Sequence, residues 1–271
     1  MKPKLIPKKE LLFLKSLNLL KFNSSKTGLM ILFDAMFFII FFYILPISNE
    51  YFAKTFAAPE KFASNSILVF FIIIITLLKL IYYLIVLLAY SFFKYCVLDY
   101  VKSLFDKTEF SFKRLSQFYS LNVIIAGIFF AVMLLFNFLL ANIKQTYQPF
   151  VFIVLAVPYS LFLYIIINTS HSLFYQGASI KESIKKSFKI TFTKIQVYRE
   201  TILVMILAAL LLWLLFLGSG YLIRLISSKN YSLYLNVYAY FKQASIIIFD
   251  LVFYAIILIN RISFYAIARN K

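Results

Sequence analysis

The chain alternates between long apolar runs and shorter segments in which lysine and other polar residues gather. A helix needs about 20 predominantly apolar residues to cross the hydrocarbon core of a bilayer. The run FFIIIITLLKLIYYLIVLLAY, which contains a single charged residue, is the clearest example. Six stretches meet this criterion, and they predict membrane-spanning helices over residues 28–47, 66–90, 122–140, 150–168, 201–218 and 244–262.

Basic residues are unevenly distributed among the segments that these helices separate. The N-terminal tail, the second and fourth connections and the C-terminal end carry 21 of the 28 Lys and Arg residues, whereas the other three connections carry six. Lysine and arginine accumulate on the cytoplasmic side of membrane proteins. The alternation therefore predicts that both termini lie in the cytoplasm. With an odd number of spanning helices, segments rich and poor in basic residues would be mixed on each side of the membrane.

The composition strengthens the membrane interpretation. Of 271 residues, 63% are hydrophobic and 14% are charged, and the mean hydropathy is +0.90. A soluble domain has roughly 45–50% apolar and about 25% charged residues. The predicted fold class is all-α, a polytopic bundle of six transmembrane helices in a cell membrane. Amphipathic helices are expected at its cytoplasmic interface.

The N-terminus, MKPKLIPKKELLFLKSLNLLKF, is basic and then apolar. Lys15 and Lys21 interrupt the apolar part, whereas the core of a signal peptide is uninterrupted. We therefore expect residues 1–27 to form a basic cytoplasmic segment on the membrane surface and residues 28–271 to form a single transmembrane domain. The longest predicted connection has about 30 residues, well short of a typical domain, so any chemistry would lie within the bundle or at its interfaces.

The net charge of +18 fits a membrane surface better than a nucleic acid, because basic residues at the cytoplasmic interface meet anionic lipid headgroups. The expected partners are thus a bilayer with anionic headgroups and a protein partner or a second copy of the chain, and no nucleic acid. One histidine and one cysteine rule out a metal site built from several such ligands. No cofactor motif is present, and we expect neither a metal nor a cofactor.

Three ionisable residues fall well inside the predicted spans, namely Asp34, Lys79 and Asp250. A charge at the centre of a membrane helix costs about 2.5–3.5 kcal/mol on insertion scales, and such residues usually face the bundle interior and pair. Lys79 has the depth to pair with either aspartate. The alternatives are a buried pair that fixes helix register, a proton or ion relay, and a snorkelling lysine with water-accessible aspartates.

The most informative local motif is SIKESIKKSFKITF, which begins at Ser179. Ser179 and Glu182 have the spacing of a capping box, which predicts a helix start. Apolar and basic side chains then follow two neighbouring stripes, as in a helix that lies in the headgroup region. The alternative is a helix docked on the cytoplasmic mouth of the bundle. The candidate lipid contacts are Ile180, Lys181, Ile184, Lys185, Phe188, Lys189 and Phe192.

The fourth predicted span contains Pro158, which is expected to kink it and free a backbone carbonyl. His171 follows this span, and we expect it to be solvated at the interface, with a pH-dependent switch as the alternative. Cys96 is expected to be an inert residue at a helix end. Membrane asparagines can hydrogen-bond between helices; the candidates are Asn137, Asn142, Asn168 and Asn260.

The layout resembles uncharacterised six-helix integral membrane families of archaea and bacteria, and it is similar to the membrane domain fused to some glycerophosphodiesterases. The segments that carry this resemblance are SIKESIKKSFKITF before the fifth span and SLFDKTEFSFKRL before the third. The resemblance implies a membrane-embedded accessory or transport-related role. It brings no catalytic residues, and the hydrolase domain is absent from this chain.

Three functions follow as hypotheses. The first is a non-enzymatic bundle with an accessory, scaffold or membrane-organising role. The second is a transporter or channel-like protein for a small solute or lipid, using Asp34, Lys79 and Asp250. The third is a lipid-active enzyme, although no phosphate loop, nucleophile elbow or cluster of acidic ligands is found in the sequence.

Overall fold

A computed structural model describes residues 11–44, 46–47, 50, 65–193, 195–227 and 231–269. These residues are almost entirely helical, and none of them lies in a strand. Six helices are long and apolar enough to cross a membrane, as the hydrophobic pattern predicts. The elements are α1 (Leu12–Phe22), α2 (Ser24–Ile39), η1 (Ile40–Ile44), α4 (Asn65–Ser103), α5 (Phe112–Ala141), α6 (Gln148–Tyr175), α7 (Ile180–Thr193), η3 (Ile195–Tyr198), α8 (Arg199–Ser227) and α9 (Tyr231–Arg269).

Most of these helices extend beyond the apolar stretches that predict them. Helix α4 continues 13 residues past the predicted end at residue 90, and α5 begins ten residues before the predicted start at 122. Hydropathy marks the part of a helix that fits the hydrocarbon, whereas backbone hydrogen bonding continues into polar sequence. The sequence FKRLSQFYSL, which precedes the third predicted span, therefore forms the first part of α5.

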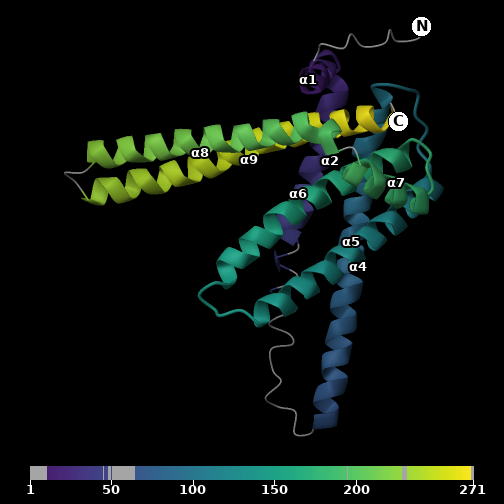
Figure 1. The fold of residues 1–271 in the computed structure, drawn as a ribbon, viewed down its shortest axis with the longest axis horizontal. Coiled ribbons are helices and arrows are strands. Elements are labelled where there is room, and N and C mark those ends of the chain that lie inside the picture. Colours follow the sequence, from purple (N-terminus) through teal and green to yellow (C-terminus); the bar gives the residue numbers. More distant parts are fainter. Residues whose placement is uncertain are drawn as a thin grey trace. The chain divides into compact units, whose positions relative to one another are not determined.

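The chain divides into two compact units. Unit 1 comprises residues 1–22 and 189–271, and unit 2 comprises residues 23–188, with the boundary falling inside α7. Within unit 1, α8 and α9 form a long antiparallel hairpin, in which the two helices lie side by side (Figure 1). The domain boundaries drawn from the sequence, 1–27 and 28–271, stay a prediction.

In unit 2, α4 is the central helix and contacts α2, α5 and α6. Aromatic contacts show that α2 and α4 are antiparallel, since Phe33 stacks on Tyr100 and Phe37 contacts Tyr90 in an edge-on arrangement. At the end of this interface the Lys26 ammonium donates to the backbone carbonyl of Ser103, at 2.6 Å. These contacts define the register of the two helices.

In unit 1, Glu200 fixes the start of α1. Its carboxylate accepts hydrogen bonds from the backbone amides of Leu12 and Phe13, at 3.0 and 2.7 Å. The first amides of a helix have no partner within the helix and favour an anion, so Glu200 satisfies both the hydrogen bonds and the helix dipole. One turn along, the hydroxyls of Ser16 and Ser263 are 2.9 Å apart, which joins α1 to α9.

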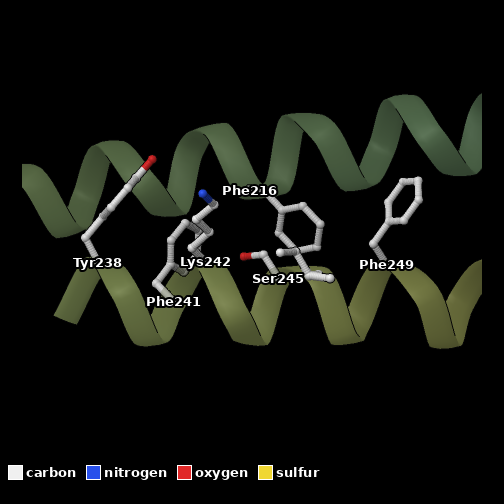
Figure 2. Close-up of a pocket in the computed structure, with 7 residues that line it drawn as sticks. Phe216, Tyr238, Phe241, Lys242, Ser245 and Phe249 are labelled. Carbon is white, nitrogen blue, oxygen red and sulfur yellow. The ribbon is translucent and has the colours of Figure 1, made fainter. Parts of the chain in front are cut away.

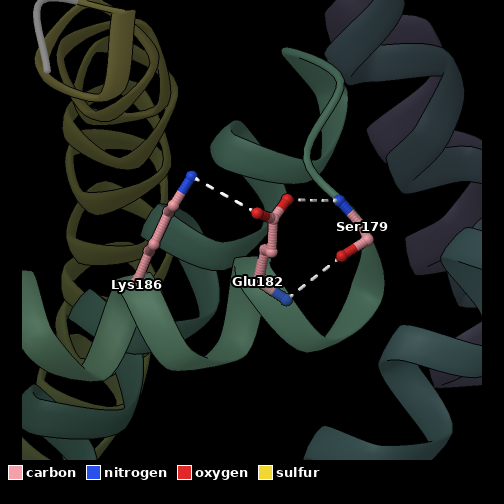
Figure 3. Close-up of polar contacts among 3 residues, drawn as sticks. All are labelled: Ser179, Glu182 and Lys186. Atoms are coloured by element: carbon pink, nitrogen blue, oxygen red, sulfur yellow. Dashed lines mark hydrogen bonds and ion pairs between the residues drawn. The ribbon is translucent and has the colours of Figure 1, made fainter.

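The capping box predicted at the start of α7 is confirmed. The Glu182 amide donates to the Ser179 hydroxyl at 3.3 Å, and the Ser179 amide donates to the Glu182 carboxylate at 3.4 Å (Figure 3). The same carboxylate lies 3.8 Å from the Lys186 ammonium. These reciprocal bonds satisfy two orphan amides and explain why the helix begins at this point.

Helix α6 contains Pro158 and is helical on both sides of it. The ring of a proline removes one backbone hydrogen bond from a helix interior, and neighbouring turns can absorb the loss. The expected kink at this residue stays a prediction.

Candidate functional site

The most concentrated group of buried polar side chains lies in unit 2, where α4, α5 and α6 meet. Asn122 of α5 is its centre. The Asn122 amide nitrogen donates to the Ser91 hydroxyl of α4 at 2.9 Å, and the His171 Nε2 of α6 lies 2.7 Å from the Asn122 carbonyl oxygen. These side chains are 0–3% exposed, so water does not compete for the bonds. We call them the Ser91–Asn122–His171 chain.

The bonding pattern assigns the donors in this chain. The Asn122 carbonyl oxygen can only accept, so His171 donates through Nε2–H. The Ser91 hydroxyl uses its proton in a 2.7 Å bond to the backbone carbonyl of Leu87. The bonds of Asn122 to Ser91 and to His171 therefore join α5 to α4 and to α6.

Aromatic rings enclose the His171 side of this chain. The Phe118 ring centroid lies 4.8 Å from that of His171 and 5.6 Å from that of Phe174. Tyr95 of α4 packs 5.8 Å from Phe118 and 4.9 Å from Tyr175. Close aromatic packing of this kind excludes water and orients the imidazole.

A second polar group lies at the same end of α4 and α6. The Tyr175 hydroxyl donates to one carboxylate oxygen of Asp99 at 2.8 Å, and the Thr108 hydroxyl donates to the other at 3.2 Å. Arg114 donates to the Phe174 carbonyl at 3.0 Å and lies over the Phe174 ring. These contacts tie the last turn of α6 to α4 and to the first turn of α5.

The residue types Ser, Asn and His also occur in hydrolase sites, but their connectivity here differs. A nucleophilic serine must hydrogen-bond to the histidine that takes its proton. In this chain Asn122 lies between them, and the Ser91 proton is bound to a backbone carbonyl. Among the described residues, no group of three or more His, Cys, Asp or Glu side chains could hold a metal ion. The arrangement is suited to joining helices.

Two of the predicted intramembrane charges, Asp34 and Lys79, belong to unit 2, and the structure does not bring them together. Asp34 is buried, with 6% of its side chain exposed, whereas Lys79 lies on an exposed part of α4. Asp34 follows Phe33, which contacts Phe93 and Tyr100. The register of α2 and α4 therefore places Asp34 about four helical turns from Lys79.

Lys94 is the basic residue level with Asp34. It follows Phe93 directly and is buried, at 8% exposed. In antiparallel helices, residues that follow two facing residues lie on the same flank of the interface. The second predicted span ends at residue 90, before Lys94, whereas α4 continues as a helix to Ser103.

The third predicted charge, Asp250, lies in unit 1 on an exposed part of α9. The prediction that Lys79 pairs with an aspartate thus has no support within unit 2.

The predicted lipid contacts lie on α7. Lys181, Lys185 and Lys189 are exposed, as is Phe192, whereas Ile180, Ile184 and Phe188 are half-buried. The Phe188 ring contacts Phe162 of α6 edge-on, at 6.2 Å. The fully buried face of the helix is instead made of small polar residues, Ser183, Ser187 and Thr191.

Two expectations about polar residues were wrong. His171 is buried, at 1% exposed, because α6 continues to Tyr175 and the residue is still inside the helix. Cys96 is likewise buried within α4 and not at its end.

The asparagines expected to link helices do not all do so. Asn142 and Asn168 donate to carbonyls of their own helices, and the Asn260 side chain is buried with no hydrogen-bond partner among the described residues. The link is made by Asn122, which the sequence marked only as the start of a span.

No protein-family model matches this chain, and neither curated proteins nor solved structures show a significant match to it.

Proposed function

We propose that this chain is a non-enzymatic multi-pass membrane protein with an accessory, scaffold or membrane-organising role in a cell membrane. One observation supports this most. Ser91, Asn122 and His171, which are buried in unit 2, bind one another and a backbone carbonyl, so they stabilise helix packing. A transport pathway would instead need polar groups that face a ligand.

The exposed apolar surface gives the partners that this role requires a place to bind. Exposed apolar side chains occur along α4 from Phe70, which is 66% exposed, to Ile85, which is 61% exposed. An exposed apolar surface on a membrane-length helix is covered by lipid tails or by other helices. The proposed partners are a bilayer with anionic headgroups and a protein partner or a second copy of the chain.

The test compares association with transport. The tagged protein is solubilised in a mild detergent, and the proteins that co-purify are quantified by mass spectrometry. A stoichiometric protein partner, or a stable oligomer of this chain, is the expected result. Solute or lipid flux through liposomes that contain only this purified protein, lost on Lys79→Leu, would overturn the proposal in favour of transport.

We also propose that both termini lie in the cytoplasm, following the distribution of basic residues. Lys107 lies in the turn between α4 and α5, and Lys144 in the turn between α5 and α6, and both side chains are exposed. The native Cys96 is buried, so background labelling should be low.

A membrane-impermeant maleimide tests the orientation in intact cells. It should label Lys144→Cys before lysis and Lys107→Cys only after lysis. The reverse pattern would place the termini outside.

A further inference from the structure

A groove runs between the two helices of the α8–α9 hairpin in unit 1. It has a volume of about 330 Å³. Figure 2 shows Phe216 of α8 and the side chains of α9 that line it. Its lining residues are Phe216, Tyr238, Phe241, Lys242, Ser245, Ile246 and Phe249. Most of this lining is aromatic or aliphatic, which suits an acyl chain or another apolar ligand.

The polar groups of the groove gather on one stretch of α9. Lys242 supplies a positive charge, and no carboxylate among the described residues forms an ion pair with it. The Ser245 hydroxyl is buried and has no hydrogen-bond partner in the described part of the chain. Tyr238 lies one turn from Lys242, and Figure 2 shows both side chains extending toward α8. A buried hydroxyl beside an unpaired cation suits an oxyanion.

The position of these groups along the hairpin matches the profile of a bilayer. The hydrophobic pattern predicts spans over 201–218 and 244–262, so Lys242 lies at the edge of the hydrocarbon and Phe216 and Phe249 lie within it. Phosphate groups of lipids are found at this edge, and acyl chains lie below them. Several tyrosines lie near the same level, as in the aromatic belts of membrane proteins: Tyr221, Tyr234, Tyr238 and Tyr240.

From these observations we propose that the groove binds a phospholipid with an anionic headgroup, in the leaflet next to the α8–α9 turn. The ammonium of Lys242 and the hydroxyl of Ser245 bind the phosphate. One acyl chain lies along Phe216, Ile246 and Phe249. A zwitterionic lipid fills the same apolar groove and gains less from the lysine, because its headgroup carries no net charge.

The single tryptophan of the chain is a natural reporter for this site. Trp213 lies on α8 three residues before Phe216, and it is 59% exposed. Lipids with brominated acyl chains quench tryptophan fluorescence on contact. The purified full-length protein is reconstituted into bilayers that mix phosphatidylglycerol with phosphatidylcholine, with bromine on one lipid at a time.

Brominated phosphatidylglycerol should quench Trp213 more strongly than brominated phosphatidylcholine at equal mole fraction. We expect a preference of about fivefold in relative affinity, in line with the contribution of one lysine to binding of an anionic lipid. Lys242→Gln should abolish the preference, whereas Lys242→Arg should keep it. Ser245→Ala should reduce it.

The matched control is Lys144→Gln, which removes the same charge from the turn between α5 and α6. It should leave the preference unchanged. Equal quenching by the two lipids in the unmodified protein would overturn the proposal without any variant. A full preference in a folded Lys242→Gln protein, with helicity and elution volume unchanged, would also overturn it.

Discussion

Two lysines on the same helix have opposite environments. Lys79 and Lys94 are 15 residues apart on α4, about 22 Å along its axis. Lys79 is surrounded by exposed aliphatic side chains, whereas Lys94 is buried level with Asp34. The half of α4 around Lys94 is also where Val97 and Val101 are fully buried. The two halves of this long helix therefore have different surroundings.

The first half of α4 has its apolar side chains exposed, and the half around Lys94 is packed against neighbouring helices. The buried half carries three charged residues, Lys94, Asp99 and Lys102, whereas the exposed half carries only Lys79. In a bilayer lipid tails are as apolar as leucine, and helix association depends on close packing and on polar contacts between helices. In the buried half, Ser91 and Asp99 provide such contacts with neighbouring helices.

The largest expected effect contrasts these two lysines. Lys94→Leu should lower the free energy of unfolding by about 3–5 kcal/mol, because it leaves the buried Asp34 without a cation at its level. Lys79→Leu should change stability little or raise it slightly. Unfolding of the purified protein in mixed micelles measures both. Equal effects at the two positions would contradict the assignment of Lys94 and Asp34 to one level of the α2–α4 interface.

A double-mutant cycle tests that assignment directly. Asp34→Asn in the Lys94→Leu background should restore part of the lost stability, because no uncompensated charge then remains buried. Additive losses from the two substitutions would show that the residues do not interact.

The next effect contrasts two asparagines. Asn122→Leu should cost about 1–3 kcal/mol, because it leaves the buried hydroxyl of Ser91 and the imidazole of His171 each short of a hydrogen bond. Asn142→Leu is the matched control, since its exposed amide bonds only to its own helix. It should change stability by about 0.5 kcal/mol or less. A loss at Asn122 no larger than at Asn142 would mean that the Ser91–Asn122–His171 chain does not hold α4, α5 and α6 together.

A smaller effect contrasts two tyrosines. Tyr175→Phe removes one hydrogen bond to the Asp99 carboxylate and should cost about 1.5 kcal/mol. Tyr147 is 61% exposed, and Tyr147→Phe should be neutral. The thermal unfolding midpoint of each variant, measured at one detergent concentration, checks the difference. A neutral Tyr175→Phe would show that Thr108 alone suffices to hold the carboxylate.

The smallest effect concerns the exposed capping box of α7. Glu182→Ala should destabilise the first turn by about 0.5–1 kcal/mol, and Glu182→Gln should keep most of the cap. Hydrogen exchange of the first amides of α7 provides the measurement, with Glu109→Ala as a control outside any helix. Retained protection in Glu182→Ala would mean that packing, and not the cap, defines the helix start.

The sequence alone was sufficient for the number and type of spanning helices and for the capping box of α7. Both depend on local properties. A run of about 20 apolar residues must be helical in a membrane because its backbone has no other hydrogen-bond partners. Reciprocal bonding between Ser179 and Glu182 depends only on their spacing along the chain.

The sequence could not identify the members of the buried polar group. Asn122 and His171 are 49 residues apart, and their bond depends on how α5 packs on α6. Hydropathy placed His171 and Lys94 outside the spans, because polar residues lower the local average even where the helix continues. Asp34 was selected as an intramembrane charge and is buried, whereas the candidate cation Lys79, which was chosen by its place within an apolar run, is exposed.

The sequence by itself thus determined that this is a helical protein with six membrane-length helices, because the bilayer acts on each segment independently. Only the tertiary structure decided which residues face protein and which face the surroundings. Lys94 is buried and Lys79 is exposed because the antiparallel register of α2 and α4, together with the packing of α5 and α6, places the contacts between helices around Lys94. That register depends on contacts between residues far apart in the chain, which hydrophobic periodicity does not encode.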